Sequence, residues 1–263
     1  MGQAMRCHLV IEPVAEPGWR NMAVDRALLD LVAEEGDAYL RLYRWGPYCL
    51  SFGRHEPAAR RYDRDRIQQL GLSVVRRPTG GRAVWHAREL TYAVAAPTAG
   101  FGTLREAHYA IHALLANALT ALGATTSLAA SGRPQPGLDA GPCFAHSVGG
   151  EIMVKGRKVV GSAQLRLGDA FLQHGSLLLE DSQDMVATLL DQTGTSLPAL
   201  DAPLSTLLGR RITFDEVGRE ICSALDGWHG PWIPADSRHT DRVRAAAARH
   251  TDLFRDDAWT WRR

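Results

Sequence analysis

The distribution of apolar and polar positions predicts a chain with strands in its middle and helices on either side. Apolar residues recur at helical spacing over residues 21–32 and 103–122, which predicts two amphipathic helices. Thr103 and Glu106 match a capping box, a pair that satisfies the first free N–H groups of a helix. Alternating or short apolar runs predict strands over residues 8–11, 37–45, 48–53, 72–75 and 90–96, the second and third of them as a pair around a Gly46-Pro47 turn.

The second half of the chain predicts a three-stranded meander followed by helices. Lys155-Gly156 is a common two-residue hairpin turn, and it separates predicted strands over 151–154 and 157–164. Residues 125–142 are rich in Gly and Pro and are predicted to form a long mobile loop. A third strand is predicted over residues 171–179, and further helices over 64–70, 183–190, 202–208, 214–225 and 242–249.

This order of elements indicates an α+β fold. It predicts a mixed, largely antiparallel central sheet flanked by helices. We expect a single domain over residues 1–263, with residues 210–263 as its helical C-terminal part. A chain of this length buries a sizeable core without disulfides.

Composition narrows the classes of function. The chain has 30 basic and 29 acidic residues and no basic run, so we expect no nucleic-acid partner. No apolar run approaches the ~20 residues that span a bilayer, and no signal-peptide core follows the N-terminus. We therefore expect no membrane contact and a cytoplasmic location. The four cysteines form no Cys-x-x-Cys pair, and no metal site is expected.

Residues 76–81, Arg-Arg-Pro-Thr-Gly-Gly, have the composition of a ligand-binding loop. Gly80 and Gly81 lack the Cβ atoms that would hold a ligand away from the backbone. Arg76 and Arg77 supply fixed positive charge beside them, so the loop could bind a phosphate or a polar acyl headgroup. From these residues alone, a hairpin turn with two solvated arginines is the simpler interpretation, because short glycine motifs are weak evidence.

A second segment changes that interpretation: residues 143–180 read CFAHSVGGEIMVKGRKVVGSAQLRLGDAFLQHGSLLLE. Together with RRPTGGRAVWH, this segment resembles the biotin/lipoate protein ligase and acyltransferase superfamily. Within it, the pattern is most similar to the cysteine-dependent octanoyl-[carrier protein]:protein N-octanoyltransferases. The resemblance runs from Asn21 to Glu180. It implies the catalytic-domain fold of the biotin and lipoate ligases, which is related to class II aminoacyl-tRNA synthetases.

The resemblance assigns roles to two residues. Cys143, in a Cys-Phe context before the hairpin, corresponds to a nucleophile that would carry the acyl group as a thioester. Lys158 corresponds to a lysine that meets the acyl carbonyl and would stabilise negative charge during attack. From the residues alone, a buried structural cysteine is the commoner case. Strand alternation also leaves open whether Lys158 points inward or into solvent.

Other small or titratable residues are candidates for substrate binding. Gly161, Ser162 and Ala163 would let a ligand approach their strand closely, or would serve close strand packing. His174 could act as a proton shuttle near neutral pH, or it could be a sheet histidine with satisfied hydrogen bonds. His86, after the glycine turn, has the same two interpretations. Which histidine, if either, deprotonates the nucleophile stays open.

The resemblance implies a reaction in two transfers. An octanoyl group would pass from octanoyl-acyl carrier protein to Cys143, and then to a lysine of a lipoyl-domain protein such as the glycine cleavage H protein. The incoming thioester is already activated, so no ATP, metal or other cofactor is expected. By the same resemblance, Val84, Val160 and Ala163 are expected to line the acyl chain.

Three alternative functions share parts of this pattern. An ATP-dependent lipoate–protein ligase would use the arginine–glycine loop for an adenylate. Arg82 after the glycines, and Gly150-Glu151 before the hairpin, depart from the pattern of many such ligases. An amidotransferase between lipoyl-domain proteins would share the cysteine chemistry and differ in its donor. A non-catalytic binding subunit would need neither the cysteine nor the lysine.

Overall fold

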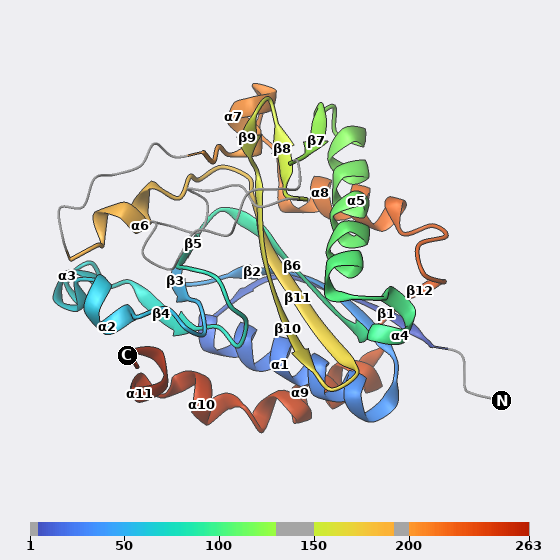
Figure 1. Ribbon diagram of the computed structural model, residues 1–263, viewed down its shortest axis with the longest axis horizontal. Coiled ribbons are helices and arrows are strands. Elements are labelled where there is room, and N and C mark those ends of the chain that lie inside the picture. The colour runs from blue at the N-terminus through green and yellow to red at the C-terminus, as the bar shows by residue number, and fades with distance from the viewer. Residues whose placement is uncertain (1–4, 130–149, 192–199, 263) are drawn as a thin grey trace.

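The computed structural model describes residues 5–129, 150–191 and 200–262 (Figure 1). Its largest sheet has six strands: β1 (Cys7–Glu16), β2 (Ala38–Trp45), β6 (Glu89–Pro97), β10 (Val160–Leu167), β11 (Ala170–Leu178) and β12 (Trp232–Pro234). They lie in the order β10-β11-β6-β2-β1-β12. The β10–β11, β11–β6 and β6–β2 pairs are antiparallel, and the β2–β1 and β1–β12 pairs are parallel. The predicted mixed, largely antiparallel sheet is confirmed.

Two smaller sheets lie beside the large one. Their strands are β3 (Cys49–Phe52), β4 (Ser73–Arg76) and β5 (Val84–His86) in one, and β7 (Thr126–Leu128), β8 (Ile152–Val154) and β9 (Arg157–Lys158) in the other. The expected pairing of the two strands around Gly46-Pro47 is wrong, because β2 joins the large sheet and β3 pairs with β4 and β5.

The predicted meander is also wrong in one respect, because the chain changes sheets at Val159. The Val159 N–H donates to the Ile152 carbonyl, 3.2 Å away, and its carbonyl accepts from the Leu178 N–H at 3.0 Å. This buried residue thus closes the β8–β9 hairpin on one side and opens the β10–β11 hairpin on the other. The strand predicted over 157–164 is therefore two strands, β9 and β10.

Helices cover both faces of the large sheet (Figure 1). On one face, α1 (Gly18–Glu35) packs against β6 and β11 and is covered in turn by α9 (Ser237–Ala248) and α10 (Thr251–Arg255). On the other face, α5 (Leu104–Ala121) packs with α8 (Phe214–Ala224). The predicted capping box of α5 is confirmed: Thr103 Oγ1 accepts from the Glu106 N–H at 3.2 Å, and Glu106 Oε2 accepts from the Thr103 N–H at 2.7 Å.

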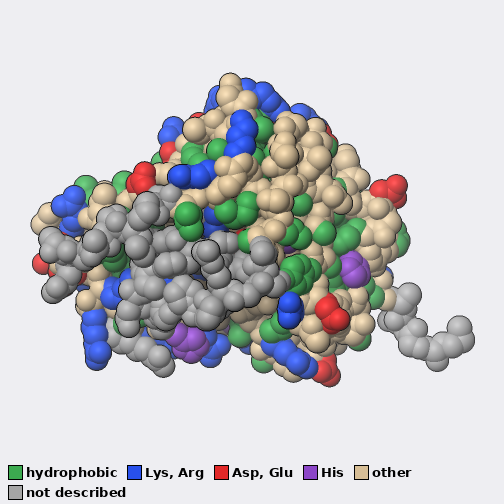
Figure 2. All heavy atoms as spheres, turned by 45° about the horizontal axis from the view of Figure 1, so that its top comes forward, with side chains coloured by type: hydrophobic (Ala, Val, Ile, Leu, Met, Phe, Trp, Pro, Cys, Tyr) green, Lys and Arg blue, Asp and Glu red, His purple; other side chains and the backbone are tan. Residues whose placement is uncertain are grey.

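The remaining helices are short: α2 (Ala58–Arg61), α3 (Arg64–Gln69), α4 (Thr98–Phe101), α6 (Asp184–Thr188), α7 (Leu204–Leu208) and α11 (Asp257–Thr260). In the part of the chain that the structure describes, no helix is long and apolar enough to cross a membrane. Charged side chains of both signs are spread over the face seen in Figure 2, as expected from the nearly balanced charge.

Strand alternation divides the core between the two faces. In β2, Leu40 and Leu42 belong to the cluster that α5 and α8 cover, whereas Tyr39 and Tyr43 belong to the cluster that α1 covers. Between them Arg41 is buried on the α1 face, where it pairs with the α1 carboxylate of Asp25 at 2.8 Å. The candidate site lies on this α1 face, where the large sheet meets β5.

Candidate active site

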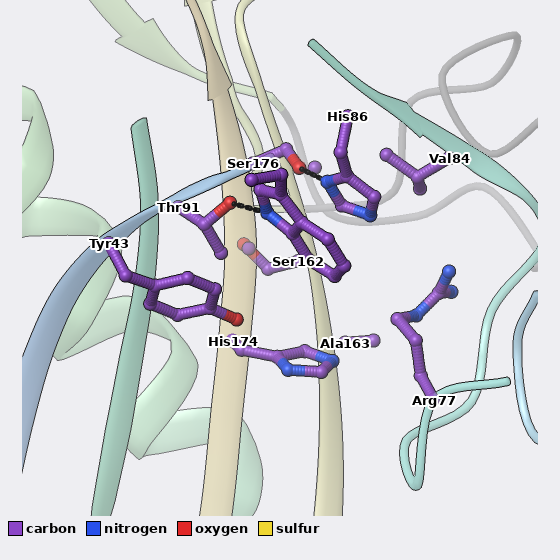
Figure 3. Close-up of a pocket in the computed structure, with 12 residues that line it drawn as sticks. Tyr43, Arg77, Val84, His86, Thr91, Ser162, Ala163, His174 and Ser176 are labelled. Carbon is purple, nitrogen blue, oxygen red and sulfur yellow. Dashed lines mark hydrogen bonds between the residues drawn. The ribbon is translucent and has the colours of Figure 1, made fainter. Parts of the chain in front are cut away.

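A small cavity, open to solvent, lies between the large sheet and the small sheet of β3, β4 and β5. His86 enters it from β5, and His174 enters it from β11 (Figure 3). Six of the predicted site residues line it: Arg77, His86, Gly161, Ser162, Ala163 and His174. The other lining residues are Tyr43, Trp45, Val84, Thr91, Gly175 and Ser176. Sequence positions nearly a hundred residues apart thus lie around one cavity.

His174 is held by a carboxylate on one side and a hydroxyl on the other. Its Nδ1 lies 2.8 Å from Asp25 Oδ2, and its Nε2 lies 2.6 Å from Thr79 Oγ1. Burial lowers the pKa of His174, so the ring is neutral: Nδ1–H donates to Asp25, and Nε2 accepts from Thr79. Burial alone would raise the pKa of Asp25, but the His174 hydrogen bond and the charge of Arg41 outweigh it, and the pKa lies below its usual value.

His86 is held in a similar way. Its Nδ1 lies 2.8 Å from Glu89 Oε1, and its Nε2 lies 2.6 Å from Ser51 Oγ. The Trp45 ring stacks on the imidazole, with ring centroids 3.8 Å apart. Ser176 Oγ also donates to Glu89 Oε1, 3.0 Å away. The imidazole is therefore fixed at both nitrogens and on one ring face.

These contacts determine which chemical groups the cavity presents to a ligand. We use the term histidine wall for His86 and His174 together with their partners Ser51, Thr79, Asp25 and Glu89. Both ring nitrogens of each histidine have partners inside the protein, so the wall presents ring faces and C–H groups rather than free donors. Such a surface favours an apolar ligand. Neither histidine is placed as a free general base.

The two adjacent arginines of the loop have separate roles. Arg77 lines the cavity, and its guanidinium donates to the carbonyls of Ser51, Gly80 and Arg82 at 2.8–3.0 Å. Arg76 lies outside the lining, fully buried, which corrects its predicted place in the site. Its guanidinium holds backbone carbonyls of the Gly53–Glu56 turn and of the C-terminal segment: Gly53, Arg54, Glu56, Trp259, Thr260 and Arg262.

The alternative of a hairpin turn with two solvated arginines is also wrong, because Arg76 and Arg77 are 0% and 4% exposed. Gly80 and Gly81 lie outside the cavity lining as well. Gly81 adopts φ +84°, which favours glycine. A Cβ at Gly53 would overlap the Gly81 carbonyl, so the close approach at this loop is between two backbone segments.

Lys158 points inward, but it is not among the residues that line the cavity. Its side chain is 1% exposed, and Nζ lies 2.5 Å from Glu151 Oε1. Lys155, in the turn of the same hairpin, is exposed and donates to the Leu207 carbonyl at 2.7 Å. Arg157 is exposed as well. We call residues 150–158 the lysine hairpin; it holds one buried ammonium beside one buried carboxylate.

Cys143 lies outside the residues that the structure describes. The other three cysteines are Cys7, Cys49 and Cys222. Burial raises the pKa of Cys49 to about 12 and also raises the pKa of the other two thiols. These three are therefore poor nucleophiles near neutral pH. Within residues 5–129, 150–191 and 200–262, no three His, Cys, Asp or Glu side chains are grouped to bind a metal ion.

Several buried polar residues of this region are absent from the sequence-based predictions, among them Asp25, Glu89 and His112. A signal exists for two of them, because each lies on the apolar stripe of its helix. Asp25 falls three residues after Met22 and three before Leu28, and His112 falls three before Leu115. A charged or polar residue at such a position indicates a buried partner. Of the predicted chain-lining residues, Val84 and Ala163 line the cavity, whereas Val160 lies in the core under α5.

The family of the chain follows from comparison with known proteins. Residues 17–226 match the family described as the lipoyl protein ligase A/B catalytic domain. The match covers well over half of the chain, and the protein belongs to this family.

Curated relatives narrow the class within that family. The octanoyltransferase LipM of Exiguobacterium sibiricum is 31% identical over 261 residues, which cover 92% of this chain and 94% of the relative. The LipM of Moorella thermoacetica is 38% identical over 81% of this chain and 82% of its own length. The LipM of Carboxydothermus hydrogenoformans is 39% identical, but that match spans 66% of this chain and 65% of the relative.

Solved structures support the fold. A protein of Thermoplasma acidophilum described as a lipoate protein ligase, with lipoic acid bound, superposes with a TM-score of 0.78 and 20% identity, over 98% of both chains. A lipoate-protein ligase A bound with ATP superposes with a TM-score of 0.76 and 19% identity, over 98% of this chain and 99% of the other. At these identities the likeness concerns the fold alone.

Proposed function

We propose that this protein is an octanoyltransferase of lipoate biosynthesis that uses Cys143 as an acyl relay. Octanoyl-acyl carrier protein is the donor, and a lysine of a lipoyl-domain protein, such as the glycine cleavage H protein, is the acceptor. The similarity to the LipM octanoyltransferases over most of the chain supports the reaction class. The apolar surface that the histidine wall presents suits an eight-carbon chain.

One observation favours thioester transfer over ATP-dependent ligation: the loop arginines hold the protein's own carbonyl groups. A ligase needs cations for the phosphates of ATP and of the adenylate. Arg76 instead donates to carbonyls of the Gly53–Glu56 turn and of the C-terminal segment, and Arg77 donates to three carbonyls of its own sheet and loop. A thioester donor brings no phosphoanhydride to the carbonyl that reacts.

The first half-reaction forms a thioester on the enzyme. The Cys143 thiol loses its proton, and the thiolate attacks the octanoyl carbonyl carbon of the donor. Negative charge develops on the carbonyl oxygen, where the Lys158 ammonium donates a hydrogen bond. The C–S bond to the carrier then breaks, and the carrier thiolate takes up a proton as it leaves.

The second half-reaction moves the acyl group to nitrogen. The neutral amine of the acceptor lysine attacks the enzyme thioester, the C–S bond to Cys143 breaks, and the nitrogen loses a proton. The products are an amide and the free Cys143 thiol. The first transfer exchanges one thioester for another of similar energy, and the second converts a thioester into a more stable amide, so neither transfer requires ATP.

Intact-mass spectrometry tests this proposal. The purified protein is mixed with octanoyl-carrier protein in the absence of ATP, and we expect a gain of one octanoyl group that hydroxylamine removes. Cys143→Ser should abolish the gain. Cys222→Ser, at a half-buried cysteine of α8, is the matched control and should acylate like the parent. A Cys143→Ser protein that still transfers octanoyl at the parental rate would overturn the relay.

Two further arms separate the alternative functions. Robust pyrophosphate exchange with ATP and free octanoate or lipoate would establish a ligase instead. Acylation of the enzyme by an octanoylated lipoyl-domain protein, but not by octanoyl-carrier protein, would establish an amidotransferase. The absence of any acylation in all arms would leave a binding subunit.

A further inference from the structure

A line of buried and half-buried polar side chains runs beneath α5, on the face of the sheet away from α1. It crosses β10, β11 and β6 and ends at the lysine hairpin. We call it the α5 hydrogen-bond chain; its five members are Gln164, Gln173, Tyr92, Ser162 and His112. Gly175 gives it room, because a Cβ there would lie 2.6 Å from Ser162 Oγ and 2.8 Å from the Tyr92 ring.

The direction of these hydrogen bonds is fixed at the His112 end. His112 Nδ1 lies 2.7 Å from the Gly150 carbonyl oxygen, which only accepts, so Nδ1 carries the proton. Burial lowers the pKa of His112 to about 3, so the ring is neutral and Nε2 accepts. Ser162 Oγ, 2.8 Å from Nε2, is therefore the donor of that hydrogen bond.

The same logic orients the rest of the chain. Because Ser162 donates to His112, it accepts from the Tyr92 hydroxyl, 2.7 Å away. Tyr92 in turn accepts from the Gln173 amide at 2.8 Å, and Gln173 accepts from the Gln164 amide at 2.8 Å. All donors point one way, toward Gly150, and hydrogen bonds aligned in this way strengthen one another.

The end of the chain is a backbone position with little freedom. Gly150 has φ +88°, and a Cβ there would lie 2.8 Å from the Tyr109 ring and 3.1 Å from His108. Its carbonyl is the one that His112 holds. The next residue, Glu151, supplies the carboxylate 2.5 Å from Lys158 Nζ. A shift of the Gly150 carbonyl would therefore move the partner of the buried lysine.

We infer that His112 is a positioning residue for acyl transfer: by holding the Gly150 carbonyl, it fixes Glu151 and, through Glu151, the ammonium of Lys158. This inference rests on the proposed function, because it assigns Lys158 a role at the acyl carbonyl. His112 itself does not contact the substrate. Ser162 belongs to this device as well, since its hydroxyl hydrogen is committed to His112 rather than to a ligand.

Two conservative variants separate the two hydrogen bonds of His112. In His112→Asn the amide nitrogen takes the place of Nδ1 and keeps the donor to Gly150. In His112→Gln the amide group lies near the place of Nε2 and keeps only the contact with Ser162. Both variants remove the ring and leave one former partner unpaired, so their losses of stability should be similar.

We measure the rate constant of self-acylation and the donor concentration at half-saturation. His112→Asn should keep most of the parental rate, whereas His112→Gln should lose ~10-fold to ~10²-fold, because small misplacement of a reacting group has effects of this size. The donor concentration at half-saturation should change little in either variant. Equal losses in the two variants, or a parental rate in His112→Gln, would overturn the inference. A change confined to the donor concentration at half-saturation, with a parental rate constant, would also overturn the inference.

A second readout does not depend on activity. Nitrogen NMR of the imidazole in the parent protein should show Nδ1 protonated and Nε2 unprotonated at neutral pH. The opposite tautomer would overturn the positioning role even if acylation is normal. Conversely, the expected tautomer in a protein that is never acylated would count against the proposed function, not against the hydrogen-bond chain.

Discussion

In the histidine wall, the carboxylates of Asp25 and Glu89 each accept hydrogen bonds from side chains of several elements. In the lysine hairpin, by contrast, the ammonium of Lys158 pairs with the carboxylate of Glu151 across a two-residue turn. Asp25 binds Arg41, Tyr43 and His174 at 2.7–2.8 Å. A wall held from so many sides can shape a cavity, but its groups are not free to exchange protons. The hairpin instead brings one ammonium to a buried position, where its charge has its largest effect.

The largest effect on stability is expected when the wall loses a charge. Asp25→Asn leaves the buried guanidinium of Arg41 with less compensation and His174 without its acceptor charge. Breaking a buried ion pair in this way destabilises a protein by roughly 3–5 kcal/mol. Urea unfolding should show this loss. Glu34→Gln, in the same helix at an exposed pair with Arg249, is the control and should lose about 1 kcal/mol or less. Equal losses would mean that the wall is no more than an ordinary helix contact.

A smaller effect, visible in pH dependence, is expected on the hairpin side. The pKa of His112 is lowered to about 3 by burial, against about 6.5 in an unfolded chain. Protonation of His112 is less favourable in the folded state than in the unfolded chain. The contribution of neutral His112 to the free energy of unfolding is therefore complete above about pH 6.5 and is lost as the pH falls toward 3. Between about pH 7.5 and about pH 5 the loss is about 2 kcal/mol.

His112→Asn removes the titrating group and should remove that part of the pH dependence. Urea unfolding of both proteins at the two pH values measures the difference. His108 also has a lowered pKa, and its ring centroid lies 3.9 Å from that of His112, so the comparison is repeated in a His108→Asn background to isolate His112. The same pH dependence in parent and variant would show that His112 is protonated in the folded protein.

The smallest effect on turnover is expected at His86, the histidine that β5 contributes to the wall. His86→Gln changes the ring face that lines the cavity, but the imidazole has both nitrogens bound and carries no proton to the reaction. We expect a higher donor concentration at half-saturation and little change in the maximal self-acylation rate, the pattern of lost uniform binding. Rapid-quench kinetics on folded protein measure both. A large fall in the maximal rate would show that His86 transfers a proton in the reaction. It would contradict the view that the histidine wall only shapes the cavity whereas the lysine hairpin acts on the substrate.

Elements with local signals could be predicted from the sequence. The Thr103–Glu106 capping box and the Lys155-Gly156 turn each depend on a few neighbouring residues, and both are found. Which strands share a sheet is not local. The change of sheet at Val159 depends on bonds to Ile152 and Leu178, and no pattern in the strand itself marks it.

The candidate site likewise combines features that the sequence predicts with features that it does not. Residue types led to the cavity, because His86, His174 and the Gly161–Ala163 run do line it. The hydrogen-bond partners could not be predicted, since they come from distant segments. Arg76 and Arg77 are neighbours of one residue type, yet one holds the C-terminal segment and the other faces the cavity.

The most direct test of the role assigned to the lysine hairpin, as opposed to the histidine wall, is the single-turnover rate of self-acylation in Lys158→Ala and Lys155→Ala. The two lysines lie in one hairpin, one buried against Glu151 and the other exposed. Loss of a donor at a developing oxyanion lowers turnover by ~10²–10³, so Lys158→Ala should fall by that factor and Lys155→Ala should stay close to the parent. The variants are compared at matched melting temperatures. Equal and mild losses in both would make Lys158 an ordinary hairpin residue and would contradict its role at the acyl carbonyl.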